Sequence, residues 1–312
     1  DGGAGNARPY YNGYYSDREG NQKAANHVVM LRNTSKGHSL YTTFQLQKNF
    51  VDGILKGLYL NGSYSFGQSR GVTDGTSSVA TSAWKYRAAL DGNAEEVGYT
   101  AGSFDGRLLL SASYTANWSK YAATSFGLIY QRYRPFSYCY NGDANGDSQF
   151  SNDLMYIPAN FDEVKDHLLP GDFDSQEDAW KAMNAFIEQD PYLSKHRGEY
   201  AERNGAVAPF ANQLDLSVSH DIKIYQKNGR SHTLRFSFNI ANLLIRNWGV
   251  VQTTVLGNQQ YQFLTILKGQ GPSAANNYTL KYTMAKDLDE TFKDNLNDVS
   301  RWQMQFGIKY IF

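Results

Sequence analysis

The sequence predicts an all-β chain whose antiparallel strands belong to a transmembrane β-barrel. Apolar and polar residues alternate along seven segments, and several segments are about twice as long as the roughly 5–6 residues of a globular strand. Aromatic residues and glycine are abundant, with 23 Tyr, 17 Phe and 28 Gly against 7 Pro, which favours strands and tight turns. A tilted strand of about 9–11 residues can cross a bilayer when every second side chain faces lipid.

The seven segments share one pattern, with apolar residues at even positions and mostly polar residues at odd positions. They lie at about residues 38–50, 58–66, 107–118, 125–131, 213–224, 233–240 and 301–312. Because successive strand side chains point to opposite faces, each segment is expected to have one apolar and one polar face. We expect even residues to face lipid and odd residues to face the barrel interior. A weaker segment, about His27 to Asn33, precedes the seven and makes about eight strands.

A soluble sheet with one wet face is the alternative explanation of this alternation. The length of the segments argues against it, because a tilted membrane span needs long strands. The position of the aromatic residues argues against it too. Phe50, Trp118 and Tyr130 lie near the ends of the apolar rows, as in the interfacial rings of membrane barrels. Both observations favour the barrel.

The connections between segments alternate between short and long, which is typical of membrane barrels. The short ones are 51–57, 119–123 and 226–231, and the long ones are about 71–103, 140–211 and 247–300. If the short turns are periplasmic, the long loops lie outside the cell, together with a brief turn at 35–37. Residues 1–25 are interpreted as a loop or incomplete segment, and residues 26–312 as the C-terminal part of a barrel.

The longest loop, 140–211, is expected to contain a short amphipathic helix, because a loop of this length is rarely without structure. Ser175 and Asp178 form a capping-box pattern at the start, and Pro191 follows the end. The helix would span Gln176–Gln189, with apolar residues at helical spacing at Trp180, Met183, Phe186 and Ile187. Packing of the loop against the barrel rim is the favoured role, and ligand binding is the alternative.

A turn rich in oxygen side chains opens the same loop and suggests a calcium site. The candidate ligands are Asp143, Asn145, Asp147 and Asp153. Oxygen ligands at alternate positions suit Ca²⁺, which is less demanding in geometry than Mg²⁺. The turn departs from a complete calcium loop at Ser148 and Leu154, where Gly and Glu are expected. An ordinary exposed polar turn is the alternative.

Arginine and aromatic residues after the fourth segment are the candidate ligand contacts at the barrel mouth. They are Arg132, Tyr133, Arg134, Phe136 and Tyr138. Guanidinium groups and aromatic faces suit sugars, peptides and carboxylates. An aromatic ring at the membrane rim is the alternative reading of the same residues.

Several classes of function find no support in the sequence. Lys+Arg and Asp+Glu are equal at 30 each, so no net charge indicates a nucleic-acid partner. The single cysteine, Cys139, excludes an intramolecular disulfide and has no CxxC neighbour. The six histidines lack HExxH spacing, and no nucleophile-elbow or Walker motif is present. We therefore expect no enzyme activity and no cofactor other than the calcium suggested above.

Two segments near the C-terminus resemble known outer-membrane proteins. The stretch Arg301–Phe312, with alternating aromatics and a terminal Phe312, resembles the last strand of outer-membrane barrels. This resemblance implies that Tyr310 and Phe312 form the signal read by the barrel assembly machinery. The stretch Leu234–Trp248, with Asn242-Leu243-Leu244 inside it, resembles the penultimate-strand segment of TonB-dependent receptors.

Other segments resemble one subgroup, the Oar-like receptors of Bacteroidota, which are relatives of the SusC-type transporters. They are residues 33–37, 74–78, 141–158 and 190–205, and the resemblance covers about residue 26 to the end. The family fold is a 22-stranded barrel with an N-terminal plug, of which this chain would supply about eight strands. The plug and the TonB box have no counterpart in these residues.

The resemblance implies a location in the bacterial outer membrane and a role in active transport. The parent protein would import a bulky nutrient, such as an oligosaccharide, a peptide or a chelate, with energy supplied through TonB. Outer-membrane lipid and a surface lipoprotein acting as a lid would be further partners. A small non-transporting barrel for adhesion or surface assembly is the alternative, since eight strands can close a barrel filled by its own side chains.

Overall fold

The chain is mostly β-structure with antiparallel sheets. The computed structural model describes residues 14–16, 22–24, 31–75, 77–103, 106–144, 151–225, 231–243, 248–256, 260–268 and 278–312. Among these residues, no helix has both the length and the apolar character needed to cross a membrane.

Seven long strands form the main sheet, and each matches one of the seven segments predicted from alternation. They are β3 (His38–Asn49), β4 (Leu58–Gly71), β6 (Arg107–Ser119), β7 (Ala122–Tyr133), β11 (Ala211–Tyr225), β12 (Ser231–Ala241) and β17 (Gln303–Ile311). Their spatial order is β17-β12-β11-β7-β6-β4-β3, with every pair antiparallel, and the two-residue β5 (Gly98–Tyr99) pairs antiparallel with the end of β4. The weaker eighth segment is not confirmed, because Leu31–Asn33 form no strand and His27 to Met30 lie outside the described residues.

The pairing between the long strands gives the sheet two faces of different chemistry. In every printed pair between neighbouring long strands, the two residue numbers are both even or both odd, except after a bulge near Ser119. One row of paired residues crosses five strands through Leu46, Gly62, Leu110, Tyr130 and Leu214. The even residues of all seven strands therefore share one side, here called the apolar face. The odd residues share the other side, the polar face.

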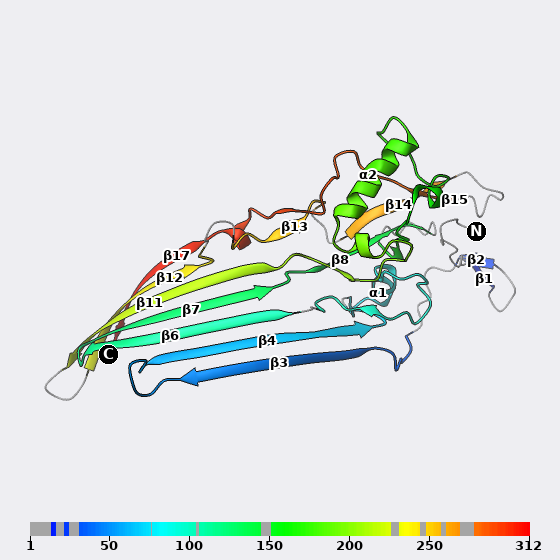
Figure 1. Ribbon diagram of the computed structural model, residues 1–312. Helices are drawn as coiled ribbons and strands as arrows, with labels where there is room; N and C mark the ends of the chain where they lie inside the picture. The colour runs from blue at the N-terminus through cyan, green and yellow to red at the C-terminus, as the bar shows by residue number, and fades with distance from the viewer. Residues whose placement is uncertain are drawn as a thin grey trace.

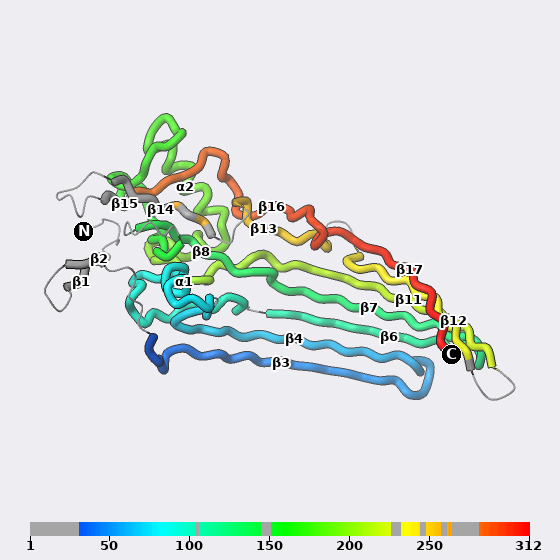
Figure 2. Tube along the Cα trace, turned by 180° about the vertical axis from the view of Figure 1, so that it is seen from behind, coloured from blue at the N-terminus to red at the C-terminus, as the bar shows by residue number. Residues whose placement is uncertain are grey.

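The short and long connections lie at opposite ends of the main sheet (Figures 1 and 2). The turn between β3 and β4, the turn between β6 and β7, and the C-terminus lie at one end, here called the turn end. The long connections lie at the other end, where they fold into a compact unit that includes α2, β8, β14 and β15. We call this unit, formed by the described parts of residues 134–210 and 252–294, the cap.

The cap and its surroundings contain the remaining elements. They are α1 (Ala80–Lys85), β8 (Ser137–Gly142), β9 (Asp153–Leu154), η1 (Phe161–Glu163), α2 (Gln176–Gln189), η2 (Leu193–Lys195), β10 (Ala206–Val207), β13 (Gln252–Thr254), β14 (Gln260–Lys268), β15 (Tyr278–Tyr282), β16 (Phe292–Asp294) and η3 (Asp298–Ser300). A second sheet has the order β10-β8-β14-β15, with β9 on β8 and with β8 and β14 parallel. β13 pairs with β16, and β1 (Tyr14–Ser16) pairs with β2 (Gln22–Ala24).

The helix predicted at Gln176–Gln189 is confirmed as α2. The Ser175 hydroxyl accepts a hydrogen bond from the Asp178 amide at 3.1 Å, which satisfies one of the free N–H groups of the first turn. The buried side of α2 packs on the cap's own core, where the Phe186 ring lies 5.3 Å from the Phe263 ring. Packing is thus the role of this helix face, although its partner is the cap core and not the rim of the sheet.

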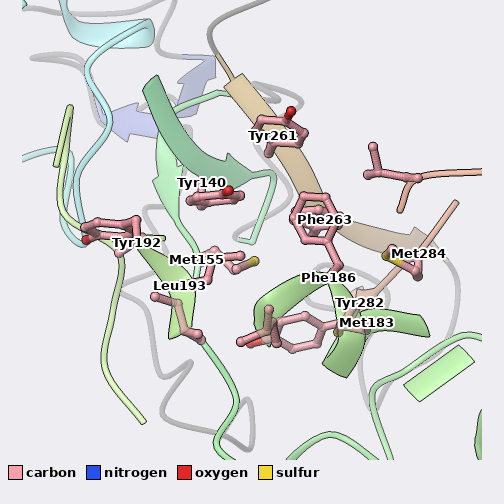
Figure 3. Close-up of a cluster of buried hydrophobic side chains, with 14 of the residues drawn as sticks. Tyr140, Met155, Met183, Phe186, Tyr192, Leu193, Tyr261, Phe263, Tyr282 and Met284 are labelled. Atoms are coloured by element: carbon pink, nitrogen blue, oxygen red, sulfur yellow. The ribbon is translucent and has the colours of Figure 1, made fainter. Parts of the chain in front are cut away.

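The buried core of the described chain lies in the cap and not in the sheet (Figure 3). It combines α2 with aromatic rings from β8, β14 and β15, and its largest fully buried side chains are Tyr138, Tyr140, Tyr261, Tyr282 and Phe186. The apolar face of the sheet, by contrast, leaves Leu46, Phe306 and Ile308 between 73% and 80% exposed. The two parts of the chain are therefore stabilised differently.

Replacing Gly57 with Ala should destabilise the turn between β3 and β4 more than replacing Gly53. Both glycines have positive φ, 91° and 70°, so each Ala variant incurs a backbone cost of about 1 kcal/mol. Only at Gly57 would the added Cβ lie 2.8 Å from the Thr115 carbonyl oxygen, whereas Gly53 faces open space. Urea unfolding should give a lower midpoint for Gly57→Ala. Equal midpoints would contradict close packing of this turn on β6.

Candidate functional site

The polar face carries a continuous hydrogen-bonded row of side chains across β6, β7 and β11. Arg107 donates to the Gln131 amide oxygen at 3.1 Å, and Gln131 donates to the Gln213 oxygen at 2.7 Å. Gln213 in turn donates to the Asp215 carboxylate at 3.1 Å. Each group leaves part of its hydrogen-bonding capacity unused, since an arginine has five N–H donors and an amide has two. Such a row can interact with water or with a polar solute.

Further polar pairs cross the same face toward the turn end. Arg235 of β12 makes a bidentate ion pair with Asp221 of β11, with N–O distances of 2.6 and 2.7 Å. At the other edge, the Thr43 and Ser65 hydroxyls lie 2.9 Å apart. Cross-strand pairs of this kind stabilise strand pairing by about 0.2–1 kcal/mol each. The polar face is thus built to stay in contact with water while its strands remain paired.

The apolar face contains a groove of about 650 Å³ that crosses β3, β4, β6, β7 and β11. It is lined by Leu46, Lys48, Leu60, Asn61, Gly62, Leu110, Ser111, Ala112, Leu128, Tyr130, Leu214 and Trp248. Small residues at Gly62 and Ala112 leave space between the surrounding leucines. The Trp248 ring stacks on the Tyr130 ring, with centroids 5.3 Å apart and planes 16° from parallel. The groove is therefore mostly apolar, with one stacked aromatic pair among its leucines.

A second groove of about 510 Å³ lies at the cap end of β3 and β4. Its lining includes Phe66 and Gln68 of β4, Tyr99 of β5, and Asn204. The Tyr99 ring is already covered by the Arg70 guanidinium at 4.0 Å, and Arg70 pairs with Glu202 at 3.3 Å. One aromatic ring of the lining, Tyr99, is therefore already occupied by a guanidinium that is itself ion-paired. This makes the groove a weaker candidate for ligand binding than its mixed lining suggests.

The five predicted ligand contacts separate into an accessible group and a buried group. Arg132 and Arg134 both lie over the Phe210 ring, at 4.2 and 4.0 Å, and Arg134 also donates to the Ala208 carbonyl at 2.6 Å. Tyr133 is half-buried and pairs with Ala211 in the sheet.

Tyr138 requires a correction to the prediction that it contacts a ligand at the mouth, because it is fully buried in the cap core. The physical reason is that β8 turns into the cap directly after β7, which places the Tyr138 ring in this core. Phe136 is half-buried and packs against the same core, and its contact with a ligand stays a prediction. Phe210 was missed in the sequence, although it directly precedes the strand that pairs with the end of β7.

Asp190 is a fully buried carboxylate that joins three segments of the cap. It accepts hydrogen bonds from Tyr138 at 3.0 Å, Tyr140 at 2.5 Å and Thr291 at 2.8 Å. It also accepts from the backbone amides of Tyr192 and Leu193, at the start of η2, at 2.9 and 2.7 Å. Burial, together with the nearby charge of Asp190, raises the pKa of Tyr138 well above its usual range. The phenols therefore remain protonated donors, and this cluster holds the cap together.

Arg203 anchors the loop after α2 to the cap end of β4. It is 5% exposed and donates to the backbone carbonyls of Gly71, Val72, Gly98 and Tyr99. Burial lowers the pKa of Arg203, but an arginine still carries its charge at neutral pH. Replacing water with four carbonyl oxygens offsets part of the cost of burying this cation. The cap is therefore fixed to the sheet by a polar anchor.

The calcium prediction falls partly outside the described residues. Asn145 and Asp147 lie outside these residues. Asp143 and Asp153 are both buried, and the Asp153 carboxylate accepts a hydrogen bond from the Ala144 amide at 2.7 Å. Among the residues that the structure describes, no group of three or more His, Cys, Asp or Glu side chains is placed to hold a metal. The calcium site stays a prediction.

The two residues of the predicted assembly signal lie at the turn end of β17. The Tyr310 hydroxyl is 2.6 Å from the His232 ring nitrogen of β12, and the two rings stack. The Phe312 ring lies 5.9 Å from the Tyr310 ring and is 91% exposed. Both aromatic residues are therefore accessible at one edge of the sheet, and their role in assembly stays a prediction.

Comparison of the chain with protein-family profiles, with curated proteins and with solved structures found no match.

Replacing Asp190 with Asn should loosen the cap. The amide keeps the shape of the carboxylate, but its NH₂ group would face hydrogen-bond donors of the cap, which would then lose their acceptor. This loss should lower the free energy of unfolding by about 1–3 kcal/mol. Limited proteolysis should then cut within residues 151–210 faster than in the wild type. The exposed Asp172→Asn variant, in the same loop, is the control. Equal cleavage of the two variants would show that Asp190 does not hold the cap.

The cap should lose stability at alkaline pH because of Cys139. Burial raises the pKa of this thiol to about 11, from an ordinary value of about 8.5. The folded state therefore holds the proton more tightly than the unfolded state. The resulting stabilisation is complete below the ordinary pKa and is lost as pH rises through about 11. A Cys139→Ala variant should lose less stability than the wild type between about pH 9 and 11. Rapid thiol labelling of the folded wild type at pH 8 would contradict this account.

Proposed function

We propose that this chain forms part of the wall of an outer-membrane β-barrel belonging to a TonB-dependent transporter. The parent protein would import a bulky nutrient, such as an oligosaccharide, a peptide or a chelate. The observation that carries the proposal is the shared register of the seven long strands, which collects their even, apolar residues on one face.

The exposure of the apolar face supports a lipid environment. Monomeric proteins in water rarely expose contiguous apolar patches larger than a few hundred Å². Here leucine, isoleucine and phenylalanine side chains are exposed on all seven strands, from Leu40 at one edge to Phe306 at the other. In a membrane the same face would meet acyl chains. The polar face, with its hydrogen-bonded amides and ion pairs, suits a water-filled interior.

The arrangement of the strands supports a tilted wall. The row that begins at Leu46, near the turn end of β3, reaches β11 at Leu214, near the cap end of that strand. Neighbouring strands are therefore staggered along their length, as the tilted strands of barrels are. The short turns would be periplasmic and the cap extracellular, which agrees with the usual asymmetry of these barrels.

The open edges of the sheet favour a large barrel over a small one. β3 and β17 are the edge strands, and they do not pair with each other in the described part of the chain. A sheet edge presents unpaired backbone groups, which lipid cannot satisfy. Further strands would therefore have to complete the wall, as the resemblance to 22-stranded transporters implies. TonB, the barrel assembly machinery and a surface lipoprotein are partners that come with this resemblance.

The mass of the intact protein in outer membranes distinguishes the proposal from its alternative. A polypeptide much larger than these 312 residues, retained in the outer membrane and required for TonB-dependent uptake, would support the transporter. A protein of about this size that folds alone would instead favour the small barrel for adhesion or assembly.

Arginine introduced on the apolar face should impair assembly more than arginine on the polar face. We expect a cost of about 2–4 kcal/mol for Leu110→Arg, Leu128→Arg or Phe238→Arg near the middle of the membrane. Ser113→Arg and Ser237→Arg, odd residues of the same strands β6 and β12 on the polar face, are the controls. Heat-modifiable migration of the protein from outer membranes measures the folded fraction. An equal loss from both sets would argue against lipid on the even side.

A further inference from the structure

The hydrogen-bonded row on the polar face begins at a positive charge and ends at a negative charge. Arg107 stands at one end and Asp215 at the other, and the amides of Gln131 and Gln213 connect them. Neither charged group forms an ion pair with any residue that the structure describes. Two opposite charges at fixed positions are therefore available to a ligand.

Hydrogen bonds to neighbouring groups hold both charges in place. The exposed Arg107 guanidinium donates to Gln131 at 3.1 Å and keeps most of its five N–H donors free. The half-buried Asp215 carboxylate accepts from Gln213 at 3.1 Å and from the Asn242 backbone amide at 2.8 Å. A carboxylate offers about four lone-pair sites, so Asp215 can accept a further donor.

The strand register sets the distance between the two charged residues. Leu109, Gln131 and Gln213 are directly paired across β6, β7 and β11. Arg107 lies two residues from this line toward the cap, and Asp215 lies two residues from it toward the turn end. With strands about 4.8 Å apart and a rise of about 3.4 Å per residue, the two Cα atoms are about 16 Å apart. An extended peptide of about four or five residues spans a similar distance.

Two aliphatic side chains interrupt the polar face beside this row. Leu109 pairs with Gln131, and Ile129 pairs with Asp215. Ile129 is 46% exposed although it has an odd number and lies among polar neighbours. An aliphatic side chain on a water-facing surface can contact an apolar group of a bound molecule. The row therefore offers apolar contact between its two charges.

We propose that the row binds a short extended peptide that has free termini and an apolar side chain near its middle. The peptide carboxylate would bind Arg107, and its terminal ammonium group would bind Asp215. The peptide groups would form hydrogen bonds with the remaining N–H groups and lone pairs of Gln131 and Gln213, which match them in donors and acceptors.

This ligand fits the row better than the other two classes of nutrient considered above. A neutral oligosaccharide would leave both charges without a counter-charge, and an anionic chelate would meet the Asp215 carboxylate. The inference rests on the proposed function, because it requires the polar face to line a water-filled interior.

Isothermal titration calorimetry of the full-length protein in detergent micelles tests the site. The probe is a five-residue peptide with one central leucine between alanines and with both termini free. Acetylation of its amino terminus should lower the affinity about tenfold, and so should amidation of its carboxyl terminus, because each change removes one charge-assisted contact. A neutral glucose pentasaccharide should bind more weakly than the free peptide.

Variants of the two charged residues assign each terminus to its partner. Arg107→Gln should weaken binding of the free peptide about tenfold but leave binding of the amidated peptide unchanged, because that peptide has already lost its charge. Asp215→Asn, which keeps an acceptor oxygen for the Asn242 amide, should behave in the same way toward the acetylated peptide. Lys309→Gln removes an exposed charge from the same face on β17 and should bind the free peptide like the wild type. Heat-modifiable migration checks that each variant is folded.

Three results would overturn the proposal. The first is equal affinity of the wild type for the free peptide and for the peptide blocked at both termini. The second is an equal loss of affinity in Arg107→Gln and Lys309→Gln. The third is tighter binding of the pentasaccharide than of the free peptide.

Uptake by cells distinguishes failure of this inference from failure of the proposed function. TonB-dependent uptake of an oligosaccharide or a chelate, without binding of the free peptide, would leave the transport function standing and reject the peptide site. Binding to the purified protein needs no energy from TonB. Binding with the expected dependence on both termini, but without TonB-dependent uptake of the peptide, would therefore support the site and reject the transport function.

Discussion

The rest of the structure depends on the register that pairs even residues with even residues across seven long strands. A shift of one residue at any pair would move a whole strand's apolar side chains to the polar face. The hydrogen-bonded row from Arg107 to Asp215 and the ion pair between Asp221 and Arg235 exist only in this register. The apolar groove also depends on it, because its lining comes from five strands.

The sheet and the cap differ in how their apolar side chains are covered. The cap has a conventional core, with aromatic rings around α2 and a buried carboxylate, Asp190, that satisfies phenol and amide donors from separate segments. In the described residues the sheet has no such core on its apolar face, where leucine and phenylalanine side chains are exposed. Under the membrane location that we propose, lipid would cover this face and water would meet the polar one. Arg203 joins the two parts through hydrogen bonds to backbone carbonyls.

The sequence was informative where structure is local and periodic. The seven long strands follow from alternation, and α2 follows from Ser175, Asp178 and helical spacing. The cap sheet could not be predicted, because its short strands come from distant parts of the chain and β8 pairs in parallel with β14. For the same reason Tyr138 was expected at the surface but donates to Asp190 inside the core. Arg132 and Arg134 were found from their residue types, whereas Phe210 requires knowledge of the pairing between β7 and β11.

Thiol labelling in intact outer membranes tests the central claim most directly, namely that one parity of residue meets lipid. Single cysteines at Leu60, Ala112 and Ile240 lie on the apolar face, and single cysteines at Ser63, Ser113 and Asn239 lie on the polar face. The buried Cys139 is replaced by Ala in all variants. The account predicts that a charged, membrane-impermeant maleimide labels only the odd set, while a lipid-soluble maleimide reaches the even set. Labelling of the even set by the charged reagent in the folded protein would contradict it.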